Sequence, residues 1–143
     1  MRKPPTECLR EGAAILGSIL HRHGFEFQWG GSGPSSGGLF AFGFFVFGDR
    51  KLELHYRHSL GLVTYHFDRL SLAHDSYMRA VLGPNRGSHY PGFSEEPLAP
   101  FEDLKFDLEH HATAFLLGDK QEFSRCVNAS KEWESNKGFS RLA

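Results

Sequence analysis

Apolar and polar residues alternate along the middle of the chain in a pattern that predicts β-strands. The segments Phe25–Trp29, Lys51–His58 and Leu62–Asp68 alternate apolar with polar residues, while Leu39–Phe47 is apolar on both faces. A strand that is apolar on both faces is typical of the interior of a sheet. No helical pattern separates these segments, so they are predicted to form a four-stranded antiparallel meander.

Helical spacing of apolar residues flanks this sheet on both sides. Helices are predicted over about residues 6–23, 71–82, 98–117 and from Asp119 onwards, with a frayed tail over 134–143. The order of one helix, four strands and three helices predicts a single α+β domain over residues 1–143. Its helices are expected to pack mainly on one face of the sheet and to leave the other face partly open.

A glycine-rich stretch interrupts the strand pattern. Residues 30–38 hold five Gly, three Ser and one Pro. This composition predicts a flexible hairpin loop, and a flap over a binding surface is the alternative. A phosphate-binding loop is not indicated, because the stretch lacks a Lys-Ser/Thr ending and leads into a strand rather than a helix.

The hairpin formed by the last two predicted strands has one polar face. A two-residue turn at Leu60-Gly61 would pair Glu53 with Asp68, His55 with His66 and Arg57 with Thr64, and would leave the apolar residues on the other side. The candidate binding residues are therefore Glu53, His55, Arg57, Thr64, His66 and Asp68.

The chemistry of this face has three interpretations. A solvated sheet surface and a binding face for a partner or ligand both fit the pattern. Paired across two strands, His55 and His66 could also share a metal ion, although a zinc site would need a further ligand. No nucleophile elbow or metal-binding helix motif is present, so the sequence assigns neither a catalytic residue nor a cofactor.

Composition narrows the function classes. The 16 Lys and Arg and 17 Asp and Glu leave a net charge of -1, which argues against nucleic acid as a partner. The two cysteines are too few for a secreted disulfide scaffold. The first residues lack the apolar run of a signal peptide, and no stretch has the apolar length of a membrane span, so a cytoplasmic protein without membrane contact is expected.

Together these features favour a small non-enzymatic protein that binds a protein partner through its polar sheet face and loops. The predicted plan resembles that of bacterial accessory proteins such as toxin-neutralising immunity proteins, a likeness of architecture alone. The alternative is a small-molecule-binding or metal-dependent protein with a histidine-bearing site on the sheet. A homodimer formed through an open sheet edge is a third alternative.

Overall fold

The structure, a computed structural model, describes residues 3–35, 38–83, 87–92 and 94–142, and for residue 35 and residues 133–142 it describes the backbone only. The elements in chain order are α1 (Pro5–Leu20), the 3-10 turn η1 (His21–His23), β1 (Glu26–Ser35), β2 (Gly38–Phe47), β3 (Arg50–Tyr56), β4 (Leu60–Phe67), β5 (Leu70–Ala73), α2 (His74–Leu82), α3 (Ala99–His111), α4 (Thr113–Leu116) and α5 (Lys120–Leu142).

The sheet is an antiparallel meander in the order β1-β2-β3-β4-β5, which confirms the predicted α+β class. It has five strands rather than four, because Leu70–Ala73 pairs with β4 before α2 begins. A turn at Asp68, whose φ is 56°, reverses the chain and lets this short segment pair. The helical pattern that starts at Ser71 hides the strand, since four residues are too few to establish an alternation of their own.

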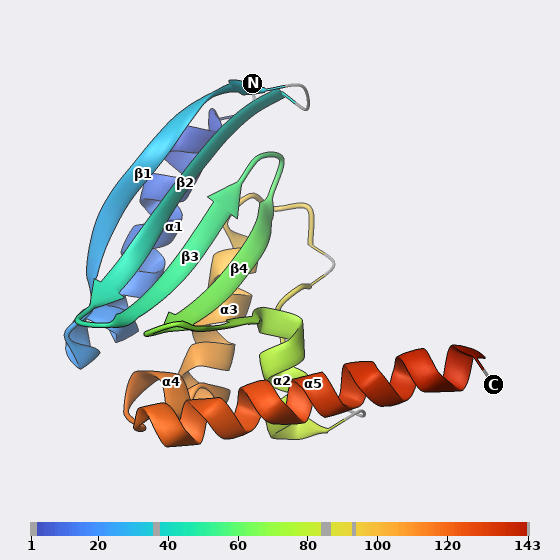
Figure 1. Ribbon diagram of the computed structural model, residues 1–143. Helices are drawn as coiled ribbons and strands as arrows, with labels where there is room; N and C mark the ends of the chain where they lie inside the picture. The colour runs from blue at the N-terminus through green and yellow to red at the C-terminus, as the bar shows by residue number, and fades with distance from the viewer. Residues whose placement is uncertain (1–2, 36–37, 84–86, 93, 143) are drawn as a thin grey trace.

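Helices cover one face of the sheet. Helix α1 lies behind β1 and β2, and α3 lies behind β3 and β4 (Figure 1). The apolar stripe of α1 includes Leu9, Leu16 and Leu20, each fully buried. These side chains join a single core with inward-facing residues of the strands such as Phe45 and Tyr65. The opposite face of β2, β3 and β4 has no helix over it in the described part of the chain (Figure 1).

The glycine-rich segment was predicted as a flexible loop, and this prediction was wrong for most of its length. Gly30 to Ser35 continue β1, and β2 begins at Gly38, so that the hairpin extends into the segment; residues 36 and 37 lie outside the described residues. At Gly30 the neighbouring strand leaves no room for a side chain, because a Cβ there would overlap with the Phe42 ring. Glycine therefore marks close cross-strand packing here.

The helices after the sheet also differ from the predicted ones. The helix expected over 98–117 is divided into α3 and α4 at Ala112, whose ψ of 30° interrupts the helix. Asp119 caps α5 as its sequence position suggests, by accepting a 2.9 Å hydrogen bond from the backbone N–H of Glu122. Helix α5 then continues to Leu142 and so includes residues 134–142, for which the sequence predicts a frayed end. None of the helices, as far as they are described, has the length and apolar character needed to cross a membrane.

Candidate functional site

The register between β3 and β4 decides which polar side chains meet on the uncovered face. Glu53 pairs with Thr64, and His55 pairs with Leu62. The predicted pairs of His55 with His66, Glu53 with Asp68 and Arg57 with Thr64 were wrong. From Glu53 to His55, each β3 residue pairs with a β4 residue four positions nearer the turn than predicted. Because four is an even number, the buried and exposed faces are correct and only the partners change.

Glu53 links the two histidines that were predicted to face each other directly. Its carboxylate accepts a 2.7 Å hydrogen bond from Nε2 of His55 and a 2.8 Å hydrogen bond from Nε2 of His66. Partial burial raises the pKa of the Glu53 carboxyl, but the hydrogen bonds from the two histidines outweigh this effect and leave the pKa below its ordinary value. The result is a fixed, ionised carboxylate between two imidazoles.

The other predicted site residues lie at the margins of this cluster. Thr64 is adjacent to Glu53 across the strands. Arg57 follows the end of β3, and Asp68 follows the end of β4, so the two lie at opposite ends of the hairpin. Asp68 forms a 2.5 Å ion pair with Lys120 of α5. It also lines a hollow together with Lys51 and His66.

An aromatic row on β2 lies beside the polar cluster. The outward side chains of this strand are Phe40, Phe42 and Phe44, all half-buried. The Phe42 ring stacks on the His55 ring with centroids 5.1 Å apart and an interplanar angle of 12°. A hollow of about 230 Å³ opens between Phe40, His55, Arg57 and Leu62. The uncovered face therefore combines an apolar row, a hollow and a polar cluster.

A buried network of hydrogen bonds lies on the opposite side of the sheet. Nε2 of His74 donates to Asp107 over 2.9 Å, and Nδ1 of His74 accepts from the Tyr65 hydroxyl over 2.8 Å. The Asp107 carboxylate also accepts hydrogen bonds from the backbone N–H groups of His89 and Tyr90, at 2.7 and 2.8 Å. Burial raises the pKa of the Asp107 carboxyl, but the hydrogen bonds from His74 and the two N–H groups together lower it below its ordinary value.

This network resembles a catalytic relay in connectivity, and His74 and Tyr90 also line a hollow of about 360 Å³ beside β4. Tyr65 is fully buried, and burial holds the pKa of its hydroxyl well above the ordinary value. The hydroxyl is therefore neutral and closed off from solvent. Its role is to join β4, α2 and α3 and to hold the loop at His89 and Tyr90 in place.

Sequence reasoning missed this network, although one signal was present. Asp107 lies on the apolar stripe of the long helix, between Leu104 and Leu108. A carboxylate at a core position needs buried donors.

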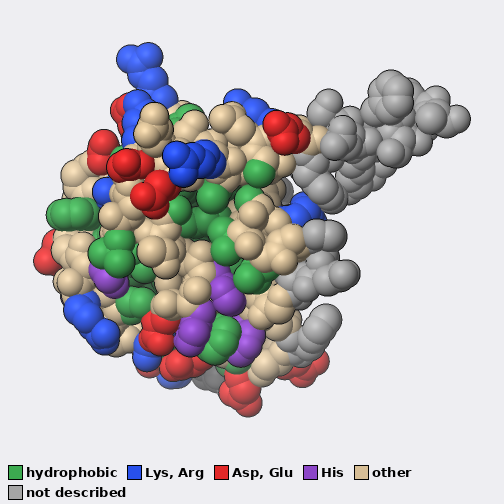
Figure 2. Space-filling view, turned by 90° about the horizontal axis from the view of Figure 1, so that it is seen from below, with side chains coloured by type: hydrophobic (Ala, Val, Ile, Leu, Met, Phe, Trp, Pro, Cys, Tyr) green, Lys and Arg blue, Asp and Glu red, His purple; other side chains and the backbone are tan. Residues whose placement is uncertain are grey.

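Histidine side chains also gather on the face of the molecule seen from below (Figure 2). The rings of His89 and His110 stack on the Phe106 ring with centroids 3.6 and 4.0 Å away, and His111 contacts its edge. Phe106 thus separates the two stacked imidazoles. Within the described residues, neither this cluster nor His55 with His66 belongs to a group of three or more ligating side chains placed to hold a metal ion.

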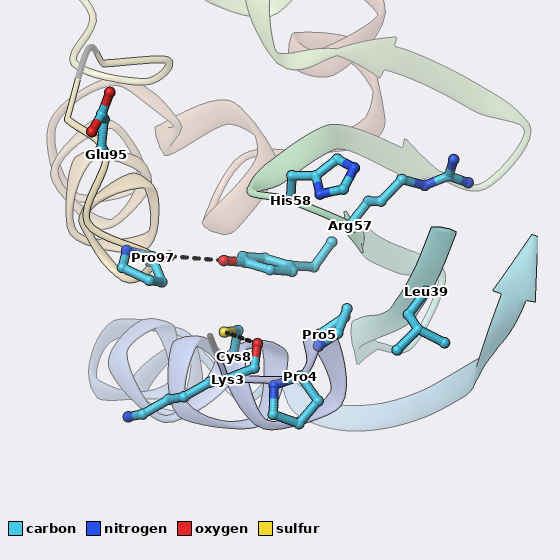
Figure 3. A pocket seen from close by; sticks show the side chains of 10 residues that line it. Lys3, Pro4, Pro5, Cys8, Leu39, Arg57, His58, Glu95 and Pro97 are labelled. Atoms are coloured by element: carbon cyan, nitrogen blue, oxygen red, sulfur yellow. Dashed lines mark hydrogen bonds between the residues drawn. The ribbon is translucent and has the colours of Figure 1, made fainter. Parts of the chain in front are cut away.

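A hollow lies near the start of α1, beside Tyr56. Its volume is about 410 Å³, and four separate chain segments supply its walls (Figure 3). Pro4, Pro5 and Cys8 form one side, and Tyr56 and its neighbours in the β3–β4 turn form another. The Tyr56 hydroxyl donates to the carbonyl of Pro97 over 3.5 Å, which connects the turn to the segment before α3.

Comparison of the chain with protein-family models, curated proteins and solved structures finds no match. Its function therefore has to come from its own residues and their geometry.

Proposed function

We propose that the chain is a non-enzymatic protein that binds a protein partner through the uncovered face of its sheet. This binding face consists of the outward residues of β2, β3 and β4, namely Phe40, Phe42, Phe44, Glu53, His55, Leu62, Thr64 and His66, with Arg57 at its margin. The observation that carries the proposal is the row of half-buried aromatic side chains beside a hollow, on a face that no described helix covers.

The composition of this binding face is typical of a protein interface. Aromatic residues and arginine are enriched at interface centres, where they surround or fill small pockets. The hollow beside Phe40 and Leu62 is large enough for one apolar side chain and not for an extended ligand. Leu62, near the turn between β3 and β4, is 45% exposed and lines this hollow.

The charges of the binding face suggest the chemistry of the partner. Lys51 extends over the Phe44 ring with its Nζ 4.7 Å from the ring centroid, and Arg57 lies at the other end. The central carboxylate of Glu53 is already hydrogen-bonded to two histidines. A partner segment with one aliphatic or aromatic anchor flanked by carboxylates complements this arrangement.

A cytoplasmic location is part of the proposal. Cys8 and Cys126 are both free thiols. Free, largely buried thiols are typical of proteins in a reducing compartment.

The proposal is tested by capture of a partner from an extract of the source cells with two matched variants. Leu62→Asp places a charge at the hollow of the binding face. Leu117→Asp places the same charge on the loop before α5, where the leucine is 67% exposed. We expect a stoichiometric partner to be retained by the wild type and by Leu117→Asp. Its affinity for Leu62→Asp should fall at least about tenfold, because a carboxylate would replace an apolar contact.

Three results would contradict the proposal. If the wild type captures no stoichiometric partner from the extract, the proposal loses its premise that the chain binds a protein. Equal affinity for the wild type and Leu62→Asp would show that the partner binds elsewhere, and equal losses in both variants would show a general effect of charge. Thermal unfolding of both variants verifies that each is folded.

A further inference from the structure

We propose that the hollow beside the start of α2 binds a small organic molecule that carries a primary ammonium group. Below it is called the α2 pocket, and its volume is about 360 Å³. Residues 60–64 of β4, residues 73–75 and the loop at Tyr90 and Pro91 line it. The α2 pocket borders the binding face at Leu62 and Thr64, but its ligand is a small molecule and does not depend on the proposed protein partner.

The α2 pocket exists because the last strand of the sheet is short. Strand β5 pairs with β4 only from Thr64 to Phe67, since the chain turns into α2 at His74. The part of β4 before Thr64 therefore extends past β5, and no other described strand pairs with it on that side. The loop closes the space from its far side, where the Tyr90 hydroxyl donates to the carbonyl of Leu60. A hollow thus takes the place that a longer β5 would occupy.

The walls of the α2 pocket carry a negative charge that no cation in the walls balances. His74 is neutral, because its Nδ1 accepts a hydrogen bond from the Tyr65 hydroxyl. Asp75 is then the one charged side chain among the described residues that line the pocket. Its carboxylate is exposed and has no hydrogen bond or ion pair with a described residue. Arg79, one turn later on α2, does not line the pocket.

A second carboxylate lies behind the wall. His74 is 3% exposed and donates to Asp107 over 2.9 Å, so a single imidazole separates this carboxylate from the α2 pocket. Burial raises the pKa of Asp107, but its hydrogen bonds hold the pKa below the ordinary value, and the group is ionised at neutral pH. Lys105 on the same helix forms an ion pair with Glu109. The α2 pocket therefore attracts a cation and repels an anion.

The remaining walls suit the apolar body of an amine. Aliphatic and ring surfaces come from Leu60, Val63, Tyr90 and Pro91. Thr64 adds a hydroxyl oxygen that can accept a hydrogen bond. A primary ammonium has three donors and no acceptor, which matches a carboxylate and a hydroxyl. Quaternary ammonium groups are bound by cages of several aromatic rings instead, and Tyr90 is the one Phe, Tyr or Trp among the described lining residues. The volume of the pocket is in the range of those that bind small molecules.

Three small probes test the charge of the ligand on the wild type alone. Phenethylamine, protonated at neutral pH, is the probe, phenethyl alcohol is its neutral equivalent, and choline is the quaternary cation. Each is followed by the amide chemical shifts of the labelled full chain. We expect phenethylamine to bind at least about tenfold more tightly than the other two. The amides that shift should be those of residues 60–64 and 73–75, which line the pocket.

Two matched variants test the carboxylate. Asp75→Asn removes the charge and should weaken phenethylamine binding at least about fivefold. Asp49, in the turn between β2 and β3, is also exposed but does not line the α2 pocket, so Asp49→Asn should leave the affinity within about twofold. Leu62→Asp should retain phenethylamine, because the new charge has the same sign as Asp75, whereas it should weaken partner capture. The two proposals therefore fail in different experiments.

The proposal is overturned if phenethylamine shifts no amide signals at millimolar concentration or if phenethyl alcohol binds as tightly. Equal losses in Asp75→Asn and Asp49→Asn would also overturn it, because the effect would then be one of net charge. Tighter binding of choline than of phenethylamine would contradict a primary ammonium as the group that is recognised. Thermal unfolding verifies that both variants are folded.

Discussion

At the scale of single residues, Asp107 is the most constrained polar group described. It is fully buried, and it accepts hydrogen bonds from His74 and from two backbone N–H groups of the loop that precedes α3. Charge-assisted hydrogen bonds of this kind are the stronger ones in proteins. The single carboxylate of Asp107 therefore connects α3 both to α2 and to the loop.

Asp107→Asn should destabilise the protein by about 2–4 kcal/mol, because the amide puts a donor against groups that themselves donate. Asp103→Asn, four residues earlier on the same helix and only half-buried, should change the free energy of unfolding by less than about 0.5 kcal/mol. Urea unfolding at neutral pH measures both. Similar values for the two variants would show that the network contributes little.

The same carboxylate predicts how stability depends on acid. The pKa of Asp107 is lower in the folded protein than its ordinary value of about 3.9, so the unfolded chain binds its proton first. This contribution to stability is complete above the unfolded pKa and is lost as the pH falls towards the folded pKa. Between about pH 5 and pH 2, Asp107→Asn should therefore lose stability less steeply than the wild type. The measurement is urea unfolding at a series of acid pH values. If the free energies of unfolding of the wild type and Asp107→Asn fall in parallel with pH, this prediction is contradicted.

The cluster on the sheet shows what residue patterns can and cannot predict. Alternation correctly placed Glu53, His55 and His66 on one face, because a strand has a period of two residues. It did not fix their partners, since a shift by an even number of residues leaves the faces unchanged. A bulge between His55 and Tyr56 then shifts the pairing by one residue, so that Tyr56 pairs with Leu60.

At the scale of elements, contact between α1 and α3 depends on a missing side chain. Gly12 faces the fully buried ring of Phe101, and a Cβ at this position would overlap with that ring. Gly17 lies on the same helix, but a Cβ there would meet only the exposed ring of His21. The two glycines differ in whether the neighbouring ring can move away.

Gly12→Ala should destabilise the protein by about 1–3 kcal/mol, because the buried ring or the helix must shift. Gly17→Ala should be neutral or stabilising by up to about 1 kcal/mol, because alanine is the better helix former and His21 can rotate into solvent. Thermal unfolding of the pair measures both effects. Equal destabilisation would contradict the difference between the two sites.

The β1–β2 hairpin explains why element prediction failed at the glycines. Glycine has poor strand propensity, so the composition of residues 30–38 indicates a loop. In the folded protein Phe42 covers Gly30 and Gly31 from the adjacent strand. This compensation exists only after the strands have paired, and local propensity does not contain it.

At the scale of the whole molecule, the helices and the sheet divide the surface into two unlike sides. Helices bury the face that carries Phe45 and Tyr65, and the opposite face keeps an aromatic row and the hydrogen-bonded cluster around Glu53. The alternation of apolar and polar residues along the two hairpin strands predicted this division, because it gives each strand one apolar and one polar side. It did not predict the hollows, whose walls come from segments far apart in the sequence.

The most direct test of the proposed binding face is hydroxyl-radical footprinting with the captured partner. Oxidation of Phe40, Phe42, Phe44 and Leu62 should fall when the partner is bound, while the exposed Leu117 should react as before. Protection of the binding face alone is the result that the account predicts. Protection at Leu117 and along the helices, with the aromatic row as reactive as in the free protein, would contradict it.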